Sequence, residues 1–184
     1  MDSVPLKRPE YTAKSANSST LQAKSASNFS PMGLPSAYLE RKAIGLAALQ
    51  AACPSAEITI KPAVIKRYKD DGSDATPWKG NAVYRPLLSL TSGRWEGYER
   101  ILDERIQKRP DSKPNDKYVT HGSPVGAGIT PLGFSITELL SMNGLLIVCA
   151  GLADGFALHE ALGAPVACCV GEANIPRIVA LLRP

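Results

Sequence analysis

The chain has 184 residues, enough for one domain with a substantial core. With 44% hydrophobic and 21% charged residues its composition is typical of a soluble globular protein and excludes fibrous and membrane classes. No apolar run reaches the ~20 residues of a membrane-spanning helix, and the start of the chain at Met1–Pro5 lacks the apolar stretch of a signal peptide. We therefore expect a cytoplasmic protein without membrane insertion. The net charge of +4 is compatible with nucleic-acid binding and equally with surface lysines that serve solubility.

The amino-terminal segment differs from the rest of the chain. Residues 1–35 are rich in Ser, Ala, Lys and Pro and hold few large apolar residues. Such a segment cannot bury enough surface to offset its ordering entropy. We expect a disordered or loosely packed basic tail over residues 1–35 and a single domain over residues 36–184. The cations of the tail either contact phosphates or an acidic partner, or are simply solvated.

The first part of the domain carries both helix and strand signals. Ser36–Lys42 offers an N-cap and a short helix, and residues 44–52 either extend this helix or form a second turn before Pro54. Alternating apolar residues predict strands over 57–60 and 63–68.

A hairpin follows. The stretch Asp70–Gly80 has the composition of a turn. Val83–Leu90, a turn at Ser92-Gly93, and Trp95–Leu102 predict two antiparallel strands. We expect the charged residues 103–117 to form an exposed loop.

The last fifty residues alternate between apolar strands and helices. Strands are expected over 144–150 and 165–170, and helices over 134–142, 153–162 and 175–182. This order predicts parallel β-α-β wrapping with helices on the faces of the sheet.

The four cysteines contain no C-x-x-C pair. Cys149, Cys168 and Cys169 lie in apolar, strand-like runs, and neighbours on a strand point to opposite faces. Buried thiols are therefore favoured over a structural zinc site.

The segment Leu145–Val166, which reads LLIVCAGLADGFALHEALGAPV, resembles the Toprim domain of plasmid and phage primases. In that family an apolar strand ends in Cys-Glu-Gly, the next helix carries His-Glu-Ala-Thr-Gly, and Pro-Val opens another strand. Upstream, Tyr38–Lys42, Gly97–Ile101 and Lys117–Gly133 are similar, in order, to further segments of the same primase region. The resemblance implies an α/β fold: an antiparallel hairpin region plus a truncated Toprim-like parallel sheet flanked by helices.

The departures from this family concern its chemistry. Toprim domains hold Mg²⁺ with a glutamate at the end of one strand and an Asp-x-Asp pair at the end of a later one. The glutamate position is Ala150 here, and no Asp-x-Asp strand is found before Pro184. We therefore expect no enzymatic activity, no metal and no cofactor.

Two main functions remain open from the sequence. The first is a non-catalytic protein-interaction factor of a plasmid or phage that acts on DNA-transfer or replication machinery, for example as an inhibitor of conjugation (fertility inhibition). The second is an accessory module that binds single-stranded nucleic acid weakly. A residual nuclease is a third, weaker alternative.

Basic and aromatic side chains are the candidate contacts for nucleic acid or a partner. They are Lys61, Lys66, Arg67, Tyr68, Lys69, Trp78, Lys79, Arg105, Lys108 and Arg109. Lysines that protect an edge strand from aggregation would give the same pattern. Because the sheet is expected to end one strand early, its exposed edge must be covered by the amino-terminal part, by a second copy in a homodimer, or by a target protein.

Overall fold

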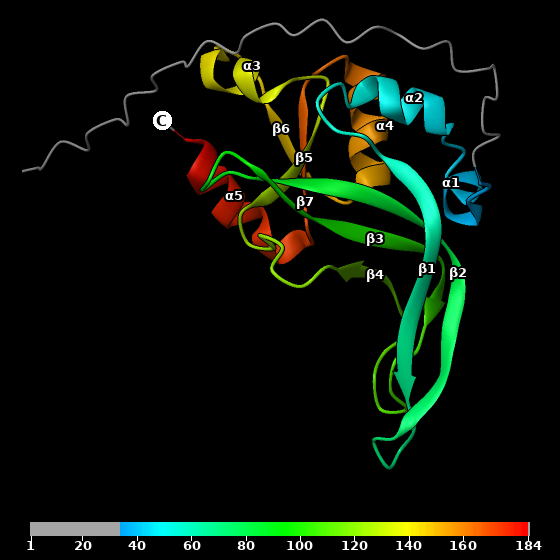
Figure 1. The fold of residues 1–184 in the computed structure, drawn as a ribbon. Coiled ribbons are helices and arrows are strands. Elements are labelled where there is room, and N and C mark those ends of the chain that lie inside the picture. The colour runs from blue at the N-terminus through cyan, green and yellow to red at the C-terminus, as the bar shows by residue number, and fades with distance from the viewer. Residues whose placement is uncertain (1–33, 184) are drawn as a thin grey trace, which may run out of the picture. The chain divides into compact units, whose positions relative to one another are not determined.

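The computed structural model describes residues 34–183, so the expected tail falls outside the described residues except for its last two positions (Figure 1). The helices are α1 (Ala37–Arg41), α2 (Leu46–Ala52), α3 (Ile136–Ser141), α4 (Leu152–Leu162) and α5 (Ile175–Leu182), with a short 3-10 helix at Glu172–Asn174. The strands are β1 (Thr59–Tyr68), β2 (Asp74–Ser89), β3 (Trp95–Ile106), β4 (Asn115–Val119), β5 (Gly128–Leu132), β6 (Ile147–Ala150) and β7 (Val166–Cys169).

The seven strands of residues 34–183 belong to one mixed sheet, which confirms the α/β class. The order is β4-β3-β2-β5-β7-β6, and β1 also pairs with β2. Only β6 and β7 are parallel, connected through α4 as the expected β-α-β unit, and every other pairing is antiparallel. The parallel part is thus two strands wide, and β5 joins it to the hairpin region, a long-range pairing that no local sequence pattern encodes.

The hairpin of β2 and β3 is confirmed, but the strands around it are longer than expected. β1 is one continuous strand where two were predicted, and β2 begins at Asp74, inside the segment predicted to be a turn. β3 continues to Ile106 and β4 starts at Asn115, so part of the expected loop is also strand. These polar segments form strands because pairing with a neighbouring strand satisfies their backbone hydrogen bonds, a long-range effect that the local sequence does not show.

The β1–β2 arm, which we define as residues 59–68 and 74–80, extends away from the helices (Figure 1). Ala63 and Ile65 of the arm pack with Ala82, Leu102 and Ile106 in a small cluster of their own. This cluster gives the arm a core separate from the one beneath the helices.

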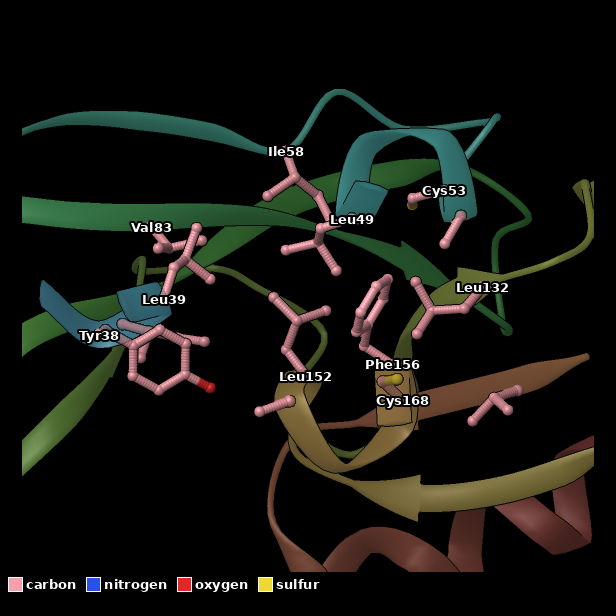
Figure 2. Close-up of a cluster of buried hydrophobic side chains, with 14 of the residues drawn as sticks. Tyr38, Leu39, Leu49, Cys53, Ile58, Val83, Leu132, Leu152, Phe156 and Cys168 are labelled. Atoms are coloured by element: carbon pink, nitrogen blue, oxygen red, sulfur yellow. The ribbon is translucent and has the colours of Figure 1, made fainter. Parts of the chain in front are cut away.

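Apolar clusters lie on both faces of the sheet. On one face, α1, α2 and α4 cover a cluster in which Leu152 and Phe156 of α4 lie beside Leu49 of α2 (Figure 2). On the other face, α3 and α5 pack over the β5-β7-β6 part. Cys168 belongs to the first cluster and Cys169 to the second, so these neighbours point to opposite faces as predicted, and both are buried.

Candidate functional site

Ala150 ends β6, immediately before α4 begins. Gly151 follows with φ of +94° and allows the sharp turn from strand into helix. The methyl group of Ala150 packs against the cluster beneath α5 and offers no oxygen for a metal.

A polar cavity of about 650 Å³ lies beyond the end of β6. It is lined by four cationic and four carboxylate side chains, Arg41, Lys42, Arg105, Lys117, Asp103, Glu104, Asp116 and Asp154. Two of the carboxylates make internal hydrogen bonds: Asp103 accepts from Ser36 Oγ at 2.7 Å, and Glu104 accepts from Trp78 Nε1 at 2.5 Å. The cavity is balanced in formal charge, and between residues 34 and 183 no three His, Cys, Asp or Glu side chains gather closely enough to hold a metal ion.

The candidate contacts at the end of the β1–β2 arm are held by the loop after β3. Arg67 Nε donates to the carbonyl of Gln107 at 3.2 Å, and the amide of Tyr68 donates to the carbonyl of Lys108 at 2.9 Å. The guanidinium of Arg109 lies 5.5 Å from the centre of the Tyr68 ring. The structure therefore brings Arg67, Tyr68, Lys108 and Arg109 together, beside a cavity of about 510 Å³ that Lys69 also lines.

The other candidates are dispersed. Trp78 packs against the arm's own cluster, so the rings of Trp78 and Tyr68 both make internal contacts. Lys66 and Lys79 are exposed on the arm, whereas Arg105 faces the polar cavity. Lys61 lies near the start of β1, at the opposite end of the arm from Tyr68, and pairs with Ala82 on β2.

Two exposed aromatic residues were missed in the sequence. Trp95 is 39% exposed and Tyr98 is 45% exposed, and with Lys61 they line a depression of about 200 Å³. Residues three apart on a regular strand point to opposite faces, but β3 contains a bulge. A glycine inside a strand, Gly97, was the available signal for this bulge.

Arg85 and Glu99 form a buried ion pair between β2 and β3. Arg85 Nε donates to Glu99 Oε2 at 2.5 Å, and neither side chain is more than 3% exposed. The guanidinium also donates to the carbonyls of Cys168 at 3.4 Å and Cys169 at 3.0 Å. The pair thus joins the hairpin to β7.

None of the helices between residues 34 and 183 has the length and apolar character that a membrane span requires. Comparisons with family models, curated proteins and solved structures each found no match. The described residues define an α/β protein with a mixed, mostly antiparallel sheet flanked by helices.

Proposed function

We propose that this chain is a non-catalytic binding protein of a plasmid or phage, derived from a primase-type Toprim domain and active in the cytoplasm. Its target is a protein of the DNA-transfer or replication machinery. The observation that carries the proposal is Ala150: at the end of a strand that enters a β-α-β unit, a methyl group in an apolar cluster stands where the resembling family has its metal-binding glutamate. In this proposal the protein acts by binding its target without catalysing a reaction, and no metal or cofactor takes part.

Inhibition of conjugation is the concrete form of this function. Primases of the resembling type are carried on conjugative elements, so the machinery that transfers DNA is the natural target. A fold inherited from such a primase retains surfaces that recognise the same machinery without processing nucleic acid.

The β1–β2 arm supplies the contact surface in this proposal. Val64 is 56% exposed, although it is a large apolar residue in the middle of β1. Lys66 is exposed two residues further on, and Lys79 is paired in register with Val64. An exposed apolar side chain with two neighbouring cations suits an acidic protein surface.

The sheet edge at β6 offers a second surface for a protein partner. Within the described chain β6 pairs only with β7, and its outer edge carries four residues. Leu145, just before this strand, is 70% exposed. A target strand or the same edge of a second copy would cover both the backbone groups and the leucine.

A mating assay tests the proposal. We expect expression of the chain in donor cells to lower the transfer frequency of at least one class of conjugative plasmid. Lys66→Glu/Lys79→Glu should restore transfer, because reversed charges on the arm repel an acidic partner. The matched control is Lys42→Glu/Arg183→Glu, which reverses two exposed cations away from the arm. Unchanged transfer of several plasmid types with the wild-type chain would contradict inhibition, and equal activity of the arm variant would remove the arm from it.

A further inference from the structure

Strands β1–β4 have one face that is turned away from α1, α2 and α4, and we name it the open face. Thr59, Tyr84, Arg100 and Tyr118 stand in register on it, one on each of four neighbouring strands. The apolar cluster beneath α3 and α5 gathers side chains of the β5-β7-β6 part and of the end of β2, and does not include this row. Tyr84 and Tyr118 pack half-buried against the small cluster around Ala82 and Leu102 on the same face. No helix of the described residues covers this row, so the accessible side chains beside that cluster are aromatic and cationic.

The bulge in β3 adds two more rings to the open face. Tyr98 pairs with Pro86, and Trp95 pairs with Leu88, so three steps along β3 match two steps along β2. Pro86 and Leu88 point to the same side of their strand, and the two rings consequently share one face. The Tyr98 ring also meets the Tyr84 ring edge-on, with 6.3 Å between the ring centres.

Cations lie among these rings. Lys61 is exposed and lines the same depression as Trp95 and Tyr98. Arg100 stands between Tyr84 and Tyr118, and its buried Nε has no hydrogen-bond partner among the described residues. Arg94 adjoins Trp95 in the chain and is exposed.

Two carboxylates share this region with the three cations. Glu57 lines the depression, and Glu96 accepts a hydrogen bond from Ser92 Oγ at 2.6 Å. The open face is therefore weakly cationic beside its exposed rings. A polyanion with planar groups complements that combination better than an acidic or an apolar peptide does.

We propose that the open face binds single-stranded nucleic acid, with Trp95 and Tyr98 stacking on successive bases and Lys61 and Arg100 beside the phosphates. Only a single strand presents the faces of its bases to such rings, and stacking is tolerant of sequence because every base has an aromatic face. The proposal does not depend on the interaction function above. It also differs from the expectation drawn from the sequence, because it uses the open face and not the end of the β1–β2 arm.

Fluorescence anisotropy with the full chain tests this proposal. Labelled oligodeoxyuridylate and oligouridylate should both bind at low salt, and the affinity should fall linearly with salt on logarithmic axes. The two probes differ only in the 2′-hydroxyl group, so preference for the oligouridylate would identify RNA as the ligand and preference for the oligodeoxyuridylate would identify DNA. Trp95→Ala/Tyr98→Ala should weaken binding by a factor of about ten or more, on the order of what base stacking contributes.

Leu162→Ala/Leu181→Ala is the matched control, because it removes two exposed apolar side chains of α4 and α5, away from the open face and the arm, and should leave binding unchanged. Thermal melts of both double variants check that they fold. We expect both to fold, because all four substituted side chains are exposed. No saturable binding by the wild-type chain at low salt, or equal affinity in the Trp95→Ala/Tyr98→Ala variant, would overturn the proposal.

Intrinsic fluorescence provides an independent readout. The chain has two tryptophans, and Trp78→Phe leaves Trp95 as the only one. An oligonucleotide that stacks on Trp95 should quench the fluorescence of this variant in a saturable way, and a duplex of the same length should do so much less. Saturable oligonucleotide binding without any quenching would remove Trp95 from the interface and contradict the proposed geometry.

Discussion

At the scale of single residues, the buried ion pair of Arg85 and Glu99 is the clearest contact that joins the hairpin of β2 and β3 to β7. β1 pairs with one edge of β2 up to Tyr84, and β5 pairs with the same edge from Leu88, so on this edge no strand partner is present at positions 85–87. Arg85 bridges this interval to the carbonyl groups of β7. Its charge is compensated by Glu99, which makes each partner dependent on the other.

Glu99→Ala should destabilise the fold by ~3–5 kcal/mol, because it leaves the buried guanidinium of Arg85 without a counter-ion. Urea denaturation followed by circular dichroism measures the change. Glu96→Ala on the same strand is the control and should change the free energy of unfolding little, since Glu96 bonds only to Ser92 at the surface. The double variant Arg85→Met/Glu99→Leu should recover much of the lost stability. A Glu99→Ala variant as stable as the wild type would show that the pair does not hold β7 to the hairpin.

At the scale of elements, the bulge in β3 positions both the open face and the loop after β4. Gly97 has φ of +71°, a conformation that glycine adopts readily. Thr120 Oγ1 accepts from the amide of Tyr98 at 2.9 Å and lies 2.7 Å from Ser123 Oγ. A side chain at position 97 would overlap Ser123 Oγ, so the glycine allows the loop to close against β3.

Gly97→Ala should therefore destabilise the protein more than Gly93→Ala. Both glycines have positive φ, +71° and +68°, so both substitutions introduce strain of about 1–2 kcal/mol. A Cβ at Gly93 meets nothing within 4 Å, whereas a Cβ at Gly97 meets the 120–123 loop. Urea denaturation of the two variants gives the comparison. Equal losses of stability would mean that the loop moves aside without cost.

At the scale of the whole molecule, the cluster beneath α1, α2 and α4 contains ionisable groups that the fold keeps neutral. Burial raises the pKa of Cys53 from its ordinary 9.0 to about 11. Burial likewise raises the pKa of Tyr38 from 10.0 to about 12. Both residues belong to the same cluster, whose packing excludes the water that would stabilise a thiolate or phenolate.

Stability should therefore fall as the pH rises above 9. The folded chain holds these protons more tightly than the unfolded chain, so their contribution is complete below pH 9 and is lost as the pH rises through about 11 for Cys53. Two pKa units correspond to at most ~3 kcal/mol for this thiol. Urea denaturation at several pH values between 8 and 11 follows the loss. Cys53→Ala removes the titrating thiol and should give a shallower decline, and an unchanged slope would assign the decline to other groups.

Local patterns in the sequence determined the elements whose side chains alternate cleanly. The hairpin of β2 and β3 and the β6-α4-β7 unit follow from apolar periodicity and turn residues, and α5 begins and ends where its pattern predicts. The position of Ala150 at the end of β6 and the opposite orientation of Cys168 and Cys169 were also readable, because strand geometry fixes both.

Only the tertiary structure decided which side chains meet. The insertion of β5 between β2 and β7 depends on long-range pairing, and so does the extension of β2 through a polar segment. In a regular strand the side chains of Trp95 and Tyr98 would point to opposite faces of the sheet. The bulge at Gly97 interrupts this alternation and brings both side chains to the same face. Composition and spacing show that cations and rings are present. Packing decides which rings are accessible: those of Tyr68 and Trp78 make internal contacts, whereas those of Trp95 and Tyr98 on the open face are exposed. Local sequence patterns do not determine this packing.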